Sequence, residues 1–164
     1  MKLESLRDLY LEQLRDLYDA EHRILDALPK MADAATHPEL RDAFLQHERQ
    51  TKEQKQRLEQ VFEKLGLSPE RDDCEAMKGL IKEGREVVKA RGDDDAPDAA
   101  LIAAAQRVEH YEIAGYGCAR TYARMLGHSD QADLLQQTLQ EEGSTDHRLT
   151  ELAERVINID ALHA

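Results

Sequence analysis

The 164-residue sequence contains no tryptophan, two cysteines, four prolines and eight glycines. No segment alternates apolar and polar residues for long enough to form a strand, and helix-forming residues dominate, so the sequence predicts an all-α protein. Cys74 and Cys118 form neither a CxxC pair nor a disulfide framework. We therefore expect free thiols in a reducing compartment, the cytoplasm.

Long apolar runs are also missing. No stretch approaches the ~18 apolar residues that a membrane-spanning helix needs. The N-terminal segment MKLESLRDLY carries charges throughout and lacks the apolar core of a signal peptide. The formal net charge of −12 repels phosphate backbones and anionic lipid surfaces. We therefore expect neither a nucleic acid nor a membrane as a partner.

The helical pattern fits one domain with a sizeable core. Helices are expected over about residues 3–35, 39–65, 75–89, 98–126 and 129–159. Gly66 and Gly127 follow two of them as C-terminal stop signals, and Ser129 is the expected N-cap of the last. Two short links and one long connection predict a ferritin-like four-helix bundle, in which the long crossover carries the short extra helix.

In each of the four long helices, polar residues interrupt the hydrophobic stripe near mid-height. The interruptions are Glu21 in the first helix, His47, Thr51 and Gln54 in the second, Glu109 and Glu112 in the third, and Glu142 and Thr145 in the fourth. Helices packed side by side bring these groups into one buried layer.

A buried layer of carboxylates needs a counter-charge. Each buried ion costs several kcal/mol, whereas a whole domain is stable by only about 5–15 kcal/mol. The stripes carry no Lys or Arg at this level, so a bound metal is the natural counter-charge. The predicted ligands are Glu21, His47, Glu109, Glu112 and Glu142, with Asp146 as a weaker one. This oxygen-rich set suits iron or manganese, as one or two ions.

A metal-free interpretation remains open. Protonated carboxylates can form a hydrogen-bond network with His47, Thr51 and Gln54 that fixes the helix register. The sequence contains no Glu-x-x-His motif of the kind that di-iron bundles use, because Thr145 stands where helix four would carry the histidine. The hydroxyl groups of three tyrosines near the layer are expected to bond its carboxylates. These are Tyr18, Tyr116 and Tyr122.

Four stretches resemble one family. LYDAEHRILDALPKMADAATHPELRDAF, QRLEQVFEKLG, AQRVEHYEIAGYG and LLQQTLQEE, with their spacing, are similar to the YciE/YciF family of bacterial stress-associated ferritin-like proteins. The resemblance implies a dimeric bundle with a dinuclear metal centre and a link to stress responses. It matches Glu21, Glu109, Glu112 and Glu142 to the family's core acids and His47 to its helix-two histidine. Gln50 stands where members often carry an acid, which leaves the number of ions open.

Two functions follow from these observations. The first is a ferritin-like non-haem metal protein that handles iron or a small oxidant, dioxygen or peroxide, with catalysis left open. The second is a non-enzymatic, dimeric interaction or scaffold protein whose buried polar layer holds no metal. A storage cage is a weaker third option, because the sequence ends soon after the fourth long helix.

Overall fold

The computed structural model describes residues 4–92 and 95–163, and in these ranges it contains helices and no strand. The all-α prediction is therefore confirmed. The elements are α1 (Leu6–Ala34), α2 (Pro38–Lys64), α3 (Glu75–Val88), α4 (Asp95–Met125), α5 (Ser129–Leu152), a π-helical turn (Ala153–Ile157) and α6 (Asn158–His163). The first helix was expected from about residue 3, which lies outside the described residues.

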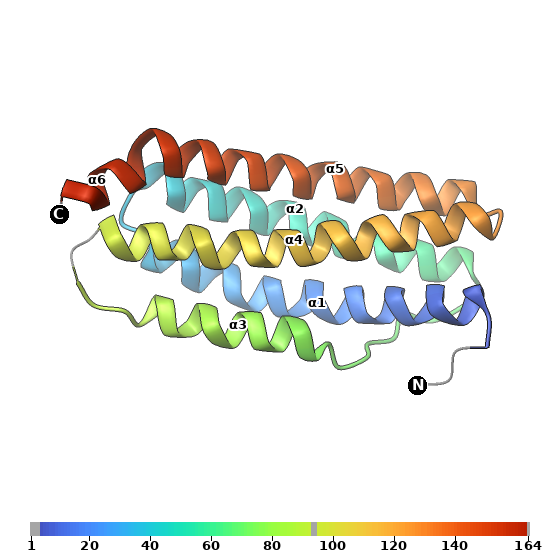
Figure 1. Ribbon diagram of the computed structural model, residues 1–164. Helices are drawn as coiled ribbons and strands as arrows, with labels where there is room; N and C mark the ends of the chain where they lie inside the picture. Colours follow the sequence, from blue (N-terminus) through green and yellow to red (C-terminus); the bar gives the residue numbers. More distant parts are fainter. Residues whose placement is uncertain (1–3, 93–94, 164) are drawn as a thin grey trace.

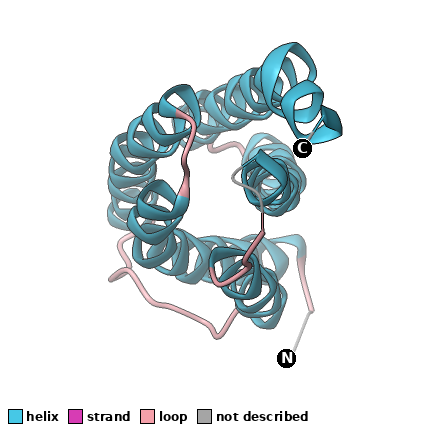
Figure 2. Ribbon diagram, turned by 90° about the vertical axis from the view of Figure 1, so that its left-hand side faces the viewer, coloured by secondary structure: helices cyan, strands magenta, loops and turns pink. Residues whose placement is uncertain are grey.

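Four long helices form the bundle (Figure 1). The pairs α1–α2 and α4–α5 are antiparallel hairpins, and α1 also packs on α4 while α2 packs on α5. The connection from α2 to α4 carries α3, which packs outside the four on α1 and α4. This is the ferritin-like arrangement that the loop lengths predicted. Seen from its end, the bundle places its helices around a common axis (Figure 2).

The ends of the helices have local causes. The Ser5 hydroxyl accepts a hydrogen bond from the Asp8 amide at 3.1 Å and caps α1. Gly66 and Gly127, two residues after the last residues of α2 and α4, adopt positive φ angles of 70° and 80°, as a C-terminal stop requires. The predicted N-cap at Ser129 was wrong by one residue. Ser129 is already helical and His128 takes the cap position, without a side-chain capping bond.

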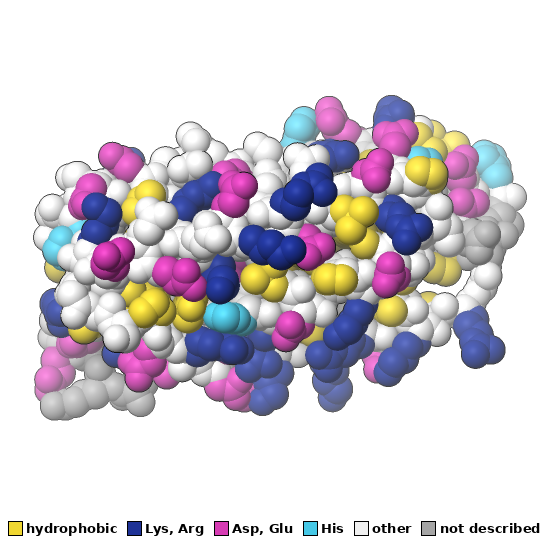
Figure 3. All heavy atoms as spheres, turned by 180° about the vertical axis from the view of Figure 1, so that it is seen from behind, with side chains coloured by type: hydrophobic (Ala, Val, Ile, Leu, Met, Phe, Trp, Pro, Cys, Tyr) yellow, Lys and Arg dark blue, Asp and Glu magenta, His cyan; other side chains and the backbone are white. Residues whose placement is uncertain are grey.

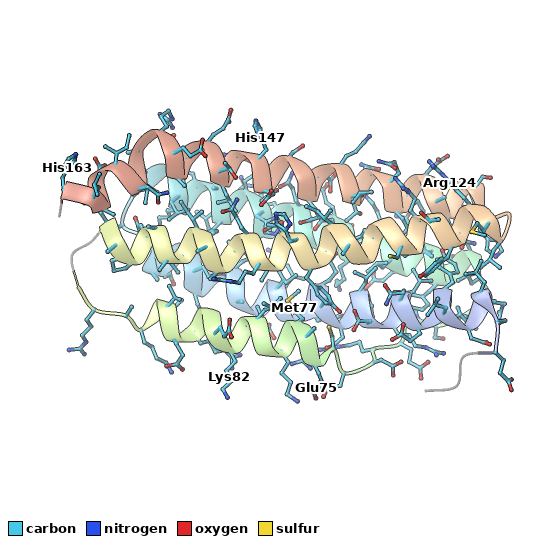
Figure 4. All side chains as sticks on the ribbon, in the orientation of Figure 1. Glu75, Met77, Lys82, Arg124, His147 and His163 are labelled. Atoms are coloured by element: carbon cyan, nitrogen blue, oxygen red, sulfur yellow. The ribbon has the colours of Figure 1, made fainter. Side chains whose placement is uncertain are left out.

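The extra helix α3 is anchored by its N-terminus. The buried carboxylate of Asp19 in α1 accepts a hydrogen bond from the Cys74 amide at 3.0 Å and two from the Arg71 guanidinium at 2.7 and 2.9 Å. Met77 points from α3 toward α1, whereas Glu75 points away from the bundle (Figure 4). The connection is therefore fixed on α1 by one carboxylate and by the buried side chain of Met77.

The core has two hydrophobic parts. One contains Ile24, Leu28, Leu40, Phe44 and Leu101, and the other contains Tyr10, Leu14, Leu58, Phe62 and Leu135. In all four long helices, the polar residues that interrupt the hydrophobic stripe lie between these two parts of the core. The expected mid-height layer therefore exists and divides the core.

The outer surface is strongly charged. Acidic and basic side chains alternate with small apolar patches over the face seen in Figure 3. Within the described ranges, no helix is long and apolar enough to cross a bilayer.

Candidate metal centre

Each long helix of the bundle contributes buried polar side chains to the layer. α1 provides Glu21, α2 provides His47, α4 provides Glu109 and Glu112, and α5 provides Glu142. All five are at most 2% exposed. Glu109 and Glu112 are three residues apart and share one face of α4 because the helix repeats every 3.6 residues. The layer is thus a consequence of helix periodicity combined with matching heights in the bundle.

Four of these residues form a close group. One ligand atom from each of His47, Glu109, Glu112 and Glu142 can be chosen so that all four atoms lie within 4.8 Å of one another. The shortest contact between them that involves the imidazole joins Nε2 of His47 to Oε1 of Glu109 at 3.2 Å. Donors from three helices therefore converge on one point.

The group leaves many polar atoms without a hydrogen-bond partner. Within the described part of the chain these include both ring nitrogens of His47, both carboxylate oxygens of Glu112, and Oε2 of Glu109 and of Glu142. The 3.2 Å contact between His47 and Glu109 lacks hydrogen-bond geometry. An unpartnered buried polar group costs about 1–3 kcal/mol, more when it is charged. The donors are thus arranged for a species that would satisfy them from the centre, and a metal cation fits that requirement.

Burial controls the protonation of the group. It raises the pKa of Glu109 and of Glu112 well above the ordinary value, and repulsion from neighbouring carboxylates raises both further. Burial also lowers the pKa of His47, although Glu142 and Glu141 oppose this shift. Without a cation these shifts favour the protonated carboxyl groups of Glu109 and Glu112 and a neutral His47 with a free nitrogen lone pair. Metal binding therefore displaces protons from the carboxyl groups.

Glu21 is buried in the same layer but is not one of the four converging residues. Its Oε1 accepts a hydrogen bond from the Tyr116 hydroxyl, while its Oε2 has no partner in the described residues. Burial raises the pKa of Glu21, as does the charge of Glu142. Burial also raises the pKa of Tyr116, so this phenol keeps its proton. Glu21 thus has one oxygen that is held by Tyr116 and one that remains available.

Asp146 lies apart from the group. Its side chain is 22% exposed, and its Oδ2 lies 3.3 Å from Nε2 of His110. Its Oδ1 accepts a hydrogen bond from the Gln106 side chain at 3.0 Å. The structure therefore gives Asp146 other partners than the four converging residues. Its assignment as a weaker ligand stays a prediction.

A cation that the stripes did not indicate lies beside the layer. Arg57 is 8% exposed, and its guanidinium bonds both oxygens of Glu141 at 2.6 and 2.8 Å. The expectation that no Lys or Arg lies at this level was therefore wrong. Gln54 donates to Glu141 at 3.1 Å and also to Glu142, so it joins the ion pair to the group. Arg57 cannot neutralise the whole layer, because Glu141 takes its charge.

Helical spacing could have indicated these residues. Arg57 lies three residues after Gln54, and Glu141 lies three residues after the buried Thr138. Each residue therefore flanks the polar part of its stripe, where a long side chain can reach inward. Charge alone suggests a solvated position for both, so the pattern of apolar residues does not indicate them.

The bonds expected of the three tyrosines have mixed outcomes. Tyr116 bonds a carboxylate of the layer as expected, but Tyr18 donates to Glu59 outside it, at 2.9 Å. Tyr122 is only partly buried beside the second hydrophobic part of the core. The exposed His147 points away from the bundle (Figure 4), so it is unable to replace the missing motif histidine.

The fold and the layer together define a class. A bundle with one long crossover and a buried group of carboxylates and one imidazole is characteristic of ferritin-like proteins. The chain belongs to the YciE/YciF family, since residues 5–162 match the family described as "Domain of unknown function (DUF892)".

Individual relatives cover nearly the whole chain. It is 43% identical to Protein YciF of Escherichia coli strain K12 over 159 residues, 96% of each chain. Its fold matches the crystal structure of the E. coli stress protein YciF with a TM-score of 0.91 and 44% identity, covering 94% of this chain and 98% of that one. YcfI of Rhodopseudomonas palustris, described as a candidate structural protein, matches with a TM-score of 0.88 and 43% identity, covering 91% and 95%.

Proposed function

We propose that this protein is a ferritin-like non-haem metal protein of the stress response, which binds one or two iron or manganese ions in its polar layer. The observation that carries the proposal is the convergence of His47, Glu109, Glu112 and Glu142 within 4.8 Å, with their polar atoms largely unpartnered. A stress-related role is supported by the similarity to the stress protein YciF.

The donor set favours particular metals. Three carboxylates and one imidazole are hard and borderline donors, which suit iron or manganese, whereas thiolates would favour zinc or copper. The nearest cysteine in the core, Cys74, contacts the Tyr111 hydroxyl at 3.1 Å and belongs to the α3 anchor. It therefore does not compete as a ligand.

The residues of the layer are proposed to have different roles in metal binding. Glu109 and Glu142 face each other from α4 and α5 and would be central ligands of the metal, and Glu112, His47 and Glu21 would complete the set that holds it. Tyr116 orients Glu21, and Gln54 orients Glu142. A bound iron or manganese ion would supply one-electron redox chemistry toward dioxygen or peroxide. The hydrophobic residues on both sides of the layer exclude bulk water from it.

A second candidate is a metal-free interaction or scaffold protein. The bonds from Tyr116 to Glu21 and from Gln54 to Glu142 favour it, because both satisfy layer carboxylates within the protein. The description of YcfI as a candidate structural protein points the same way for that relative. The unpartnered atoms of Glu112 and His47 favour the metal instead.

The dimer is part of both candidate functions. We keep a homodimer as the proposed assembly, on the family resemblance alone, and sedimentation of the purified protein tests it. The cytoplasm is the proposed location, and the free thiols of Cys74 and Cys118 agree with a reducing compartment.

The metal content of the protein decides between the two functions. Purified protein is incubated anaerobically with Fe(II) or Mn(II), desalted and analysed for metal per chain. Two ions, with a ligand-to-metal absorption band after oxygen is admitted, support a redox di-iron protein. One ion supports a mononuclear site, in keeping with Gln50 and Thr145. A folded protein that retains no metal would refute the proposal and leave the scaffold function.

A further inference from the structure

Two adjacent hollows lie between α1, α3 and α4. The outer one has a free volume of about 40 Å³ and the inner one about 10 Å³. Four side chains line both of them: Ala27, Met31, Ile81 and Val108. The two hollows are therefore adjacent, and small movements of these four side chains can join them into one path inward.

The inner hollow reaches the candidate metal centre. Its lining includes His47 and Glu109, the two residues whose side chains approach within 3.2 Å in the close group. By contrast, the hollow between α2 and α5 at Gln50 and Thr145 is lined by none of the proposed ligands. The inner hollow under α3 therefore reaches the centre, whereas the hollow at Gln50 ends short of it.

The path is apolar along its length. Of the residues that line it, only Lys30 and Arg85 at the outer hollow and His47 and Glu109 at the inner end carry ionisable groups. An ion would lose its hydration there without compensation, and a water molecule needs two to four polar partners that the middle of the path lacks. The path thus selects for small uncharged molecules of low polarity.

The dimensions set the size of that molecule. About 10 Å³ is close to the least free volume that a single water-sized molecule needs. Met31, Ile81 and Val108 are each 8–9% exposed, so the path begins just below the surface. Met31 is unbranched and adapts its shape easily, which allows a diatomic molecule to pass without a large backbone movement.

We propose that the crevice beneath α3 is the entry path by which dioxygen, a small apolar molecule, reaches the His47–Glu109 side of the centre. α3 forms its outer wall, and Ala27 is a small residue that lines both the outer and the inner hollow. The identity of the molecule as an oxidant rests on the proposed function, whereas the existence of the path does not.

Xenon, an apolar atom that enters dry protein cavities, tests the path without any metal. The methyl resonances of Ile81 and Val108 are followed by NMR in the metal-free, full-length protein as xenon is added. We expect saturable shifts of both. In Ala27→Leu, which fills the shared wall, the xenon dissociation constant should rise about tenfold.

Ala34→Leu is the matched control, because Ala34 is also a partly buried residue of α1 at the same hydrophobic part of the core but lines neither hollow. It should respond to xenon as the wild type does. If Ala27→Leu does not fold, Ala104→Leu fills the outer hollow instead. Absence of xenon-dependent shifts at Ile81 and Val108 in the wild type, or an unchanged response in both filling variants, would overturn the path.

The metal content separates this inference from the proposed function. If the protein binds xenon at Ile81 and Val108 but retains no metal, the result supports the entry path and refutes the metal-binding function. If the protein retains metal but gives no response to xenon, the result supports the metal-binding function and refutes the entry path. In the metal-loaded protein, the reaction with dioxygen should be about tenfold slower in Ala27→Leu than in Ala34→Leu, while metal per chain stays the same.

Discussion

Arg57 of α2 and Glu141 of α5 form a two-point ion pair beside the carboxylate layer, with N–O distances of 2.6 and 2.8 Å. The Arg57 guanidinium also donates to the Thr138 hydroxyl at 3.2 Å. The pair joins two helices that belong to different hairpins. It is therefore a contact that holds the two halves of the bundle at a common height.

Removing the cation of this pair is expected to destabilise the fold. Arg57→Met leaves the mostly buried Glu141 carboxylate unpaired, so the free energy of unfolding should fall by about 2 kcal/mol, below the range for fully buried pairs. Chemical denaturation measures it. The control is Arg41→Met, since Arg41 and Asp33 form a pair in which both side chains are exposed; its loss should be below about 0.5 kcal/mol. Equal losses of unfolding free energy in the two variants would contradict the inference that the Arg57–Glu141 pair holds the two halves of the bundle together.

Metal binding should depend on the four converging residues and much less on Asp146. Glu109→Ala removes a central donor and is expected to abolish metal retention after desalting. Asp146→Asn should retain the wild-type amount, because Asp146 is bonded to Gln106 instead of facing the close group. Metal analysis of both folded proteins measures this. Full metal content in Glu109→Ala would contradict the assigned centre.

Tyr116 should increase the affinity for the metal in addition to stabilising the core. Tyr116→Phe removes the bond that orients Glu21, so we expect a metal dissociation constant about tenfold higher. The matched control is Tyr10→Phe, because Tyr10 is equally buried in the same hydrophobic part of the core but bonds Gln131, at 2.9 Å, away from the layer. Both variants should lose about 1 kcal/mol of stability. Only Tyr116→Phe should weaken metal binding, and isothermal titration calorimetry measures the dissociation constants of both variants.

The metal-free protein should become less stable as the layer loses its protons. Burial raises the pKa of Glu21, Glu109 and Glu112 in the folded state above the ordinary value of about 4.3 that the unfolded chain retains. The folded state then binds more protons than the unfolded state. The contribution of these groups is therefore complete below the unfolded pKa and is lost as pH rises toward the raised folded values.

A variant isolates this contribution from the other carboxyl groups. Glu112→Gln removes one titrating group and keeps its shape. The free energy of unfolding of the metal-free variant, relative to the metal-free wild type, should increase steadily as pH rises from about 4 to 8. Urea denaturation at several pH values measures the difference. A difference that is independent of pH would show that Glu112 does not hold a proton in the folded protein.

Much of the fold is readable from local pattern. Helix periodicity placed Glu21, Glu109 and Glu142 at mid-height of their stripes, and all three are buried at that height. Loop lengths predicted the crossover, because short links force antiparallel neighbours and a long one allows the chain to pass to the far side. The end of the last long helix was harder, since the π-helical turn at Ala153–Ile157 has no distinct signature in the pattern.

The sequence by itself determined the all-α class, the hairpins and the residues of the layer, because these depend on spacing along single helices. Only the tertiary structure decided which members converge and how each is satisfied. His47, Glu109, Glu112 and Glu142 meet at one point, while Asp146 is bonded elsewhere. Arg57 reaches inward although its position resembles a surface one. The physical reason is that rotation and height of neighbouring helices are set by packing of the whole core, which no single stripe encodes.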